Sequence, residues 1–220
     1  MAAARTRVVR REGVAEGTMA FHLERPAGFD FQAGQNLNLS LGEGETRTFT
    51  IASAPHEPAL MVATRMRKES TFKQRLATMP LTEPITIDGP NGMMTLHDDA
   101  SRPAVFIAGG IGITPFLSMA RDAAHRRLEH PLTLLYSNRR PQDAAFLEEL
   151  RRMPNLRLVA RMTEAEGFMD EAFFRKHLAE AKAPMVYLAG PPAMTMAVQG
   201  TLAGLGVPDD AIRSEEFYGY

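Results

Sequence analysis

Three glycines follow a short apolar run within residues 105–115, whose sequence is VFIAGGIGITP. The glycines are Gly109, Gly110 and Gly112. The apolar run has the composition of a strand, and Thr114 and Pro115 are suited to cap and open a helix over residues 116–127. A strand, a glycine turn and a helix start in this order present backbone N–H groups to a phosphate. Pro115 stands where GxGxxG has its third glycine, so a purely structural tight turn is the alternative interpretation.

Residues 47–53, RTFTIAS, combine a cation, an aromatic ring and hydroxyls within one predicted strand. Alternation along a strand places Arg47 and Phe49 on one side and Thr48 and Thr50 on the other. This combination indicates a strand whose side chains bind a ligand. The alternative is an ordinary barrel strand with one exposed arginine.

A polar turn, Ser137-Asn138-Arg139-Arg140-Pro141, follows a predicted strand of the second half. The adenosine ribose of a dinucleotide would lie there, because open α/β sheets bind nucleotides at the carboxyl ends of their strands. A hydroxyl and two arginines suit a 2′-phosphate, whereas Asp or Glu would suit an unsubstituted ribose. We therefore predict a phosphate contact from Arg139 and Arg140, with a solvated basic loop as the alternative.

The elements that must position these residues change in character along the chain. The first half reads as short strands separated by Gly, Pro and charged turns, which favours an antiparallel barrel or sandwich. Its predicted strands are Thr6–Arg11, Thr18–Glu24, Gln35–Leu41, Arg47–Ala52, Leu60–Arg67 and Ile85–Asp88, with one helix after Ser70-Thr71. In the second half strands alternate with helices, which favours a parallel sheet with right-handed crossovers. After the glycine turn, the predicted elements are Leu132–Tyr136, Asp143–Arg152, Leu156–Arg161, Asp170–Ala181, Met185–Ala189 and Pro192–Leu205.

Composition excludes several classes of function. The net charge of −1 gives no argument for nucleic acid or an anionic membrane as partner. No apolar run is long enough for a transmembrane span, and the N-terminal residues lack the apolar block of a secretory signal, so we expect a cytoplasmic protein. The absence of cysteine excludes disulfides, thiolate metal sites and cysteine-ligated iron–sulfur clusters within this chain. The histidines show no HxxxH or HExxH spacing, so we expect no metal.

Five motifs in order along the chain resemble the ferredoxin–NADP reductase superfamily. They are RTFTIAS at 47–53, DGPNG at 88–92, GGIGITP at 109–115, LAGPPAM at 188–194 and the ending Ile212-x-x-Glu215-x-Phe217. The resemblance implies two domains: a FAD-binding antiparallel β-barrel over residues 1–100 and an NAD(P)-binding α/β parallel-sheet domain over residues 101–220. It implies the stand-alone form without an iron–sulfur domain.

The implied activity is that of a FAD-dependent NAD(P)H oxidoreductase. A hydride would pass from NADPH or NADH to FAD, and electrons would leave to a separate acceptor, a ferredoxin- or flavodoxin-like protein or a small molecule. Two alternatives stay open: a reductase of free flavin, and a non-catalytic nucleotide-binding subunit of a larger redox complex. The arginines of the 137–141 turn lead us to expect a preference for NADPH.

The resemblance also implies roles for individual residues. Arg47 would pair with the FAD pyrophosphate, Phe49 would stack on the isoalloxazine ring, and Thr50 would offer its hydroxyl to the reactive ring nitrogen. Further residues implied on the FAD side are Thr48, Thr64, Arg65, Met66, Ser70, Thr71 and Phe72. Those implied on the nicotinamide-nucleotide side are Gly109, Gly110, Gly112, Thr114, Pro115, Ser137, Arg139, Arg140, Gly190, Pro191 and Met194.

The tail carries three aromatic residues in its last four positions. By resemblance, Glu215 would relay a proton or orient the nicotinamide, and Phe217 would lie beside the flavin. Tyr220, preceded by Gly219, would act as a movable lid. The alternative is that the tail aromatics anchor the last strand by packing between the domains.

The sequence departs from the family pattern at three places. The family usually has Tyr where this chain has Phe49, which keeps the stacking ring and loses one hydroxyl contact worth roughly 1 kcal/mol. Ser70 and Lys73 stand where the family often has Gly-x-x-Ser at the phosphate helix, so Lys73 could offer a charge in place of a hydroxyl. Ala189 replaces a family cysteine beside the nicotinamide, which affects the expected rate more than the type of reaction.

Overall fold

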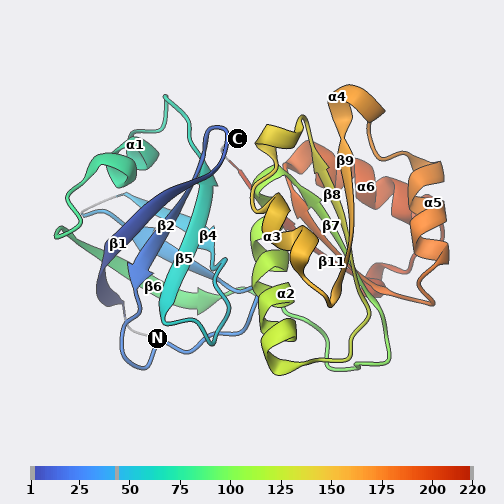
Figure 1. Cartoon of the computed structure of the whole chain (residues 1–220), viewed down its shortest axis with the longest axis horizontal. Coiled ribbons are helices and arrows are strands. Elements are labelled where there is room, and N and C mark those ends of the chain that lie inside the picture. The colour runs from blue at the N-terminus through green and yellow to red at the C-terminus, as the bar shows by residue number, and fades with distance from the viewer. Residues whose placement is uncertain (1–2, 43–44, 219–220) are drawn as a thin grey trace.

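The computed structural model of this chain describes residues 3–42 and 45–218. Two sheets lie side by side: an antiparallel sheet curled into a barrel, and a parallel sheet with helices on both faces (Figure 1). The predicted fold class is confirmed. The strands of the two sheets span residues 4–91 and 104–216, while the predicted division of the chain into domains at residue 100 stays a prediction.

The barrel sheet has six strands in the order β4-β3-β6-β1-β2-β5, and its edge strands β4 and β5 contact one another. Its strands are β1 (Ala4–Ala15), β2 (Thr18–Glu24), β3 (Asn36–Ser40), β4 (Thr46–Thr50), β5 (Ala59–Arg65) and β6 (Pro84–Asn91). Helix α1 (Thr71–Thr78) begins after Ser70, whose hydroxyl accepts a hydrogen bond from the Lys73 N–H at 3.3 Å. Because Phe72 and Leu76 recur at helical spacing, α1 buries both in the barrel core.

The second sheet is parallel throughout, with the order β11-β10-β7-β8-β9. Its strands are β7 (Ala104–Gly109), β8 (Leu132–Asn138), β9 (Leu156–Met162), β10 (Met185–Gly190) and β11 (Ile212–Glu216). The helices that join them are α2 (Thr114–Arg126), α3 (Leu147–Arg152), α4 (Thr163–Glu166), α5 (Glu171–Ala179) and α6 (Pro192–Gly204). Three short 3₁₀ turns, η1 (Gly110–Ile113), η2 (Pro141–Asp143) and η3 (Asp209–Ala211), complete the elements.

The central strands β7 and β10 are buried along their whole length, as their continuous apolar sequences require when both faces of a parallel sheet are covered. One face packs against α5 and α6, where Phe174, Val198 and Leu202 are buried. The other face packs against α2, which lies between the parallel sheet and the barrel (Figure 1). One hydrophobic cluster therefore includes residues of both sheets, and the two halves of the molecule share a core.

One predicted element is wrong. The helix expected over Asp143–Arg152 is broken, because Phe146 adopts a left-handed backbone with φ of 59° and α3 begins only after it. Among the residues that the structure describes, no helix is long and apolar enough to span a membrane.

Candidate functional site

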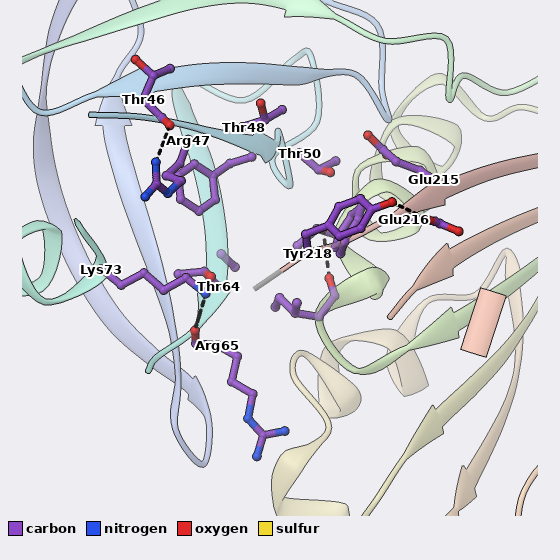
Figure 2. A pocket seen from close by; sticks show the side chains of 15 residues that line it. Thr46, Arg47, Thr48, Thr50, Thr64, Arg65, Lys73, Glu215, Glu216 and Tyr218 are labelled. Carbon is purple, nitrogen blue, oxygen red and sulfur yellow. Dashed lines mark hydrogen bonds between the residues drawn. The ribbon is translucent and has the colours of Figure 1, made fainter. Parts of the chain in front are cut away.

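A cavity of about 380 Å³ lies where the barrel edge strands meet the glycine turn and the tail; we call it the first cavity (Figure 2). Its lining residues are Thr46, Arg47, Thr48, Phe49, Thr50, Ala63, Thr64, Arg65, Lys73, Ile111, Thr114, Glu215, Glu216, Phe217 and Tyr218. Arg47 and Lys73 lie at one end of this group, whereas Glu215, Glu216 and Tyr218 lie at the other (Figure 2). The first cavity is therefore cationic at one end and acidic at the other.

The cationic end suits a bound anion. Arg47 donates to the Thr46 carbonyl at 2.9 Å, and its guanidinium lies 5.5 Å from the centre of the Phe72 ring. Burial, and after it the positive charges of Arg67 and Arg47, lower the pKa of Lys73. A phosphate bound beside these cations would offset both the burial of the Lys73 charge and the repulsion from the two arginines.

The acidic end contains a carboxyl group held between the two sheets. The Asn36 side-chain amide on β3 donates to Glu215 Oε1 on β11 at 3.0 Å. Glu215 Oε2 is buried and has no hydrogen-bond partner within the described part of the chain. Burial raises the pKa of Glu215, and the Asn36 hydrogen bond opposes this rise only in part. Glu215 is therefore suited to hold a proton next to the buried Thr50 end of β4.

The tail closes this end of the first cavity. The Phe217 N–H donates to the Gly190 carbonyl at 2.9 Å, and the partly buried Phe217 ring packs against the shared core. Tyr218 is 78% exposed, and its hydroxyl donates to Glu216. Phe217 therefore packs against the core and also lines the first cavity, while its predicted place beside the flavin stays a prediction. The predicted lid, Tyr220, lies outside the described residues.

A second cavity, of about 550 Å³, lies at the carboxyl ends of the parallel strands. Its lining residues are Thr18, Arg65, Gly109, Gly110, Ile111, Ser137, Asn138, Arg139, Asp143, Thr163, Phe168, Met169, Pro191, Ala193, Met194, Ala197 and Val198. Arg65 and Ile111 line both cavities, so the two adjoin. The Arg65 side chain extends away from Lys73 (Figure 2).

The glycine turn differs from its prediction in two respects. Thr114 does not cap α2: it is the first residue of that helix, and its hydroxyl donates to the Ile111 carbonyl at 3.1 Å. A Cβ on Gly112 would lie 2.3 Å from the Ala189 carbonyl oxygen, so this glycine is required for packing against β10 rather than for contact with a ligand. Gly110 has a φ of 53°, a left-handed conformation that favours glycine.

The two arginines of the polar turn have carboxylate partners. Arg139 lines the second cavity and donates to Glu164 Oε1 at 2.5 Å. Arg140 instead donates to both carboxylate oxygens of Asp143, at 3.0 and 2.8 Å, and lies 3.4 Å from Glu16 in the turn between β1 and β2. This hydrogen bonding by Arg140 lowers the pKa of Asp143. Arg140 therefore joins the two sheets, and its position does not fit the predicted 2′-phosphate contact.

The predicted site residues fall into three groups. Those that line the first cavity are Arg47, Thr48, Phe49, Thr50, Thr64, Arg65, Thr114, Glu215 and Phe217. Those that line the second cavity, besides Arg65, are Gly109, Gly110, Ser137, Arg139, Pro191 and Met194. Within the described residues, those that line neither are Met66, Ser70, Thr71, Phe72, Gly112, Pro115, Arg140 and Gly190.

The lining residues to which the sequence analysis gave no role include Asn138, Asp143, Phe168 and Tyr218. Asn138 could have been recognised from the sequence as a lining residue, because it is polar and stands at the same strand end as Ser137. Tyr218 carried a weaker signal as one of the tail aromatics. Asp143 ends the 3₁₀ turn η2, and Phe168 stands in the loop after α4; the sequence pattern determines the course of neither segment.

Comparison with known proteins agrees with this geometry. A family model described as "Oxidoreductase NAD-binding domain" matches residues 106–200. The chain is 30% identical, over 213 residues, to the reductase component of propane 2-monooxygenase from Mycolicibacterium smegmatis, covering 87% of this chain and 60% of that protein. It is 27% identical to reductase component 2 of terephthalate 1,2-dioxygenase from a Comamonas species, covering 80% of this chain and 56% of that protein.

Solved structures share the fold over nearly the whole chain. A ferredoxin NADP+ reductase from Neisseria gonorrhoeae with bound FAD and NADP superposes with a TM-score of 0.85 at 20% identity, covering 98% of this chain and 99% of that one. The reductase components that the chain matches are longer, and the chain spans a little over half of their length. The family model identifies residues 106–200 as an oxidoreductase NAD-binding domain, and the chain as a whole is similar in fold to a ferredoxin NADP+ reductase and in sequence to the reductase components of oxygenase systems.

Proposed function

We propose that the chain is a FAD-dependent NAD(P)H oxidoreductase. The first cavity would hold FAD and the second the nicotinamide nucleotide. The observation that carries the proposal is that the two cavities adjoin, with Arg65 and Ile111 lining both. When bound, the nicotinamide would supply a hydride, and FAD would accept it and supply electrons to a separate acceptor.

The residues of the first cavity fit FAD. Arg47 and Lys73 supply positive charge for its pyrophosphate. Glu215 Oε2, which is buried without a partner among the described residues, supports a polar ligand group at the other end.

The chain's own contribution is to bind, orient and exclude water, since the redox chemistry belongs to the cofactors. Arg47 and Lys73 anchor the phosphates, Thr50 offers a hydroxyl to the flavin ring, and Glu215 holds a proton at its carboxyl group. Gly109 and Gly110 let the backbone approach the nucleotide pyrophosphate. Phe217 and Tyr218 cover the cavity from the tail.

We further propose that the acceptor is a protein. The support is that several relatives are named as reductase components, a reductase subunit or an electron transfer component of dioxygenase and monooxygenase systems. The roles assigned to single residues and the cytoplasmic location expected from the sequence stay predictions.

The test begins with purified protein passed through gel filtration and titrated without oxygen with NADH and with NADPH. We expect FAD to elute with the protein and to be reduced. Loss of FAD on the column, with turnover restored by added flavin, would favour the free-flavin reductase. Retained FAD that neither nucleotide reduces would favour the non-catalytic subunit. Ferredoxin, flavodoxin, cytochrome and ferric chelates, offered to the reduced protein, then identify the class of acceptor.

A further inference from the structure

One face of helix α2 lies against the barrel (Figure 1). Thr114, Ser118, Arg121 and His125 follow one another on α2 at intervals of three or four residues, so their side chains lie along one face of the helix. The first of them, Thr114, lines the first cavity. This face therefore runs from the proposed flavin site toward the far end of α2.

The same face holds the barrel segment that follows β4. The Ser118 hydroxyl donates to the Ser53 carbonyl at 2.7 Å, and both residues are completely buried. Arg121 donates to the Ala52 carbonyl at 3.4 Å and to Glu57 Oε1 at 3.2 Å. Two consecutive carbonyls of the barrel are therefore bound by donors from one helix of the other half.

Further contacts fix this arrangement. Arg121 donates to both carboxylate oxygens of Glu149 on α3, at 2.6 and 2.8 Å, and such a paired contact fixes the direction of the guanidinium. At the far end of the face, the His125 ring stacks on the His56 ring of the same barrel segment, with ring centres 3.7 Å apart and planes 8° apart. The helix and the barrel segment thus contact one another along most of the length of α2.

Both partners in this contact lead directly to the proposed site. On the helix side, the Thr114 hydroxyl donates at 3.1 Å to the carbonyl of Ile111, which lines both cavities. On the barrel side, Ala52 comes two residues after Thr50, which lines the first cavity. Because a close-packed interior transmits strain, a shift of α2 relative to Ala52 would move Thr50 relative to the glycine turn.

We propose that Ser118 and Arg121 are positioning residues for hydride transfer. By binding the Ser53 and Ala52 carbonyls, they fix β4 relative to the glycine turn, so that the two halves hold their cofactors at the separation and orientation that the reaction requires. Neither side chain is among the described residues that line the first or second cavity, so both act through the backbone that they hold. The inference rests on the proposed function, because it takes the two cavities as the FAD and nucleotide sites.

The test separates the rate of reduction from binding, on the FAD-loaded protein. Ser118→Ala removes the hydroxyl, and Arg121→Lys keeps the charge but loses the fork of fixed N–H donors. In stopped-flow experiments at saturating nucleotide, the FAD of each variant should be reduced about tenfold more slowly than that of wild type, because small misplacements of reacting groups are costly. The dissociation constants of FAD and of the nucleotide should stay within about twofold of the wild-type values.

A second readout needs no turnover. Tetrahydro-NADH and tetrahydro-NADPH bind without transferring a hydride, and stacking of their ring on oxidised flavin gives a charge-transfer absorption that depends on the overlap of the rings. At saturating analogue, this absorption should be weaker in Ser118→Ala and in Arg121→Lys than in wild type. A loss of stability alone would not change it.

Thr6→Val and Arg102→Lys are the matched controls. The Thr6 hydroxyl donates to the Glu24 carbonyl at 2.5 Å within the barrel, and Arg102 donates to the Ala183 and Pro184 carbonyls at 2.9 and 3.3 Å outside it. Neither control residue is among the described residues that line the first or second cavity. Each control loses the same kind of hydrogen bond as its counterpart, so it should lower the thermal stability while keeping the wild-type rate and absorption.

A wild-type rate and absorption in either variant would remove that residue from the positioning role, and in both variants would overturn the inference. A fall in rate that the two controls share, or loss of FAD in place of slower reduction, would also overturn it. If one variant does not fold, the other decides. Failure of the proposed function is a different result: neither NADH nor NADPH would reduce the FAD of wild-type protein, and neither analogue would give the absorption with it.

Discussion

The side-chain amide of Asn36 donates to Glu215 Oε1 at 3.0 Å, across a separation of 179 positions in the chain. Asn36 lies on barrel strand β3, and Glu215 lies on β11 at the edge of the parallel sheet. This hydrogen bond joins the two sheets at the acidic end of the first cavity. It orients one oxygen of a carboxyl group whose other oxygen is buried without a partner among the described residues.

Glu215→Gln should remove a pH dependence of stability. Burial raises the pKa of Glu215 above its usual 4.5, so the folded state binds this proton more tightly than the unfolded state does. Stability contributed by the protonated group is therefore lost as the pH rises from the unfolded value through the folded one. Glutamine is neutral throughout and keeps an acceptor for Asn36. Thermal unfolding, measured from about pH 4 to 8, should show that the stability of the variant rises relative to that of wild type as the pH rises.

Glu83→Gln is the control for this measurement, because Glu83 pairs with Arg75 at a site that lines neither cavity. A difference between Glu215→Gln and wild type that stays constant with pH would contradict the assignment of the buried proton to Glu215.

Arg47→Ala should weaken the binding of FAD by about thirtyfold, from the loss of a charge-assisted phosphate contact of roughly 2 kcal/mol. Arg47 makes few protein contacts that would be lost with it: a hydrogen bond to its neighbour Thr46 and a contact with the Phe72 ring. Fluorescence titration of the apoprotein with FAD measures the effect. Arg75→Ala, which removes a cation paired with Glu83 instead, should leave the affinity unchanged. Equal affinities of Arg47→Ala and wild type would remove Arg47 from the phosphate site.

The fold could be predicted from the sequence because its signals are local. The alternation of Asn36–Leu41 and the continuous apolar run before Gly109 indicate a half-buried and a fully buried strand, and both strands form. The break at Phe146 could not be predicted in this way. A left-handed backbone at an aromatic residue depends on the packing around it, which composition does not encode.

The site could be predicted only in part, because its energetics depend on partners that lie far apart in the chain. Arg140 has the right residue type for a phosphate, but Asp143 and Glu16 occupy its guanidinium. Gly112 is the residue type expected in a turn that binds a ligand, but the group packed against it is the Ala189 carbonyl. Asn138 shows the reverse case: neither polar atom of its buried amide has a partner among the described residues, which only a three-dimensional structure reveals.

Thr50→Val should slow the reduction of bound FAD about tenfold, if the hydroxyl contributes roughly 1.4 kcal/mol more in the transition state than in the ground state. Thr50 is buried at the end of β4 and lines the first cavity, and valine keeps its shape. Stopped-flow reduction at saturating nucleotide measures the rate. Thr86→Val is the control, because Thr86 is also a threonine on a barrel strand, β6, but lines neither cavity. An unaltered rate with FAD still bound would exclude this role for Thr50.

Tyr218→Ala should leave the stability of the protein unchanged while altering the flavin spectrum and the affinity for the nucleotide. Tyr218 is 78% exposed, so its removal costs little buried area, yet it lines the first cavity beside Glu216. Tyr218→Phe keeps the ring and loses only the hydrogen bond to Glu216, so it should behave as wild type if the ring is what covers the flavin. Deletion of Gly219 and Tyr220 tests the lid predicted from the sequence in the same assays. If Tyr218→Ala keeps the wild-type spectrum and affinity while the deletion changes both, residues 219–220 cover the flavin and Tyr218 does not. If neither variant differs from wild type, the tail does not cover the cavity.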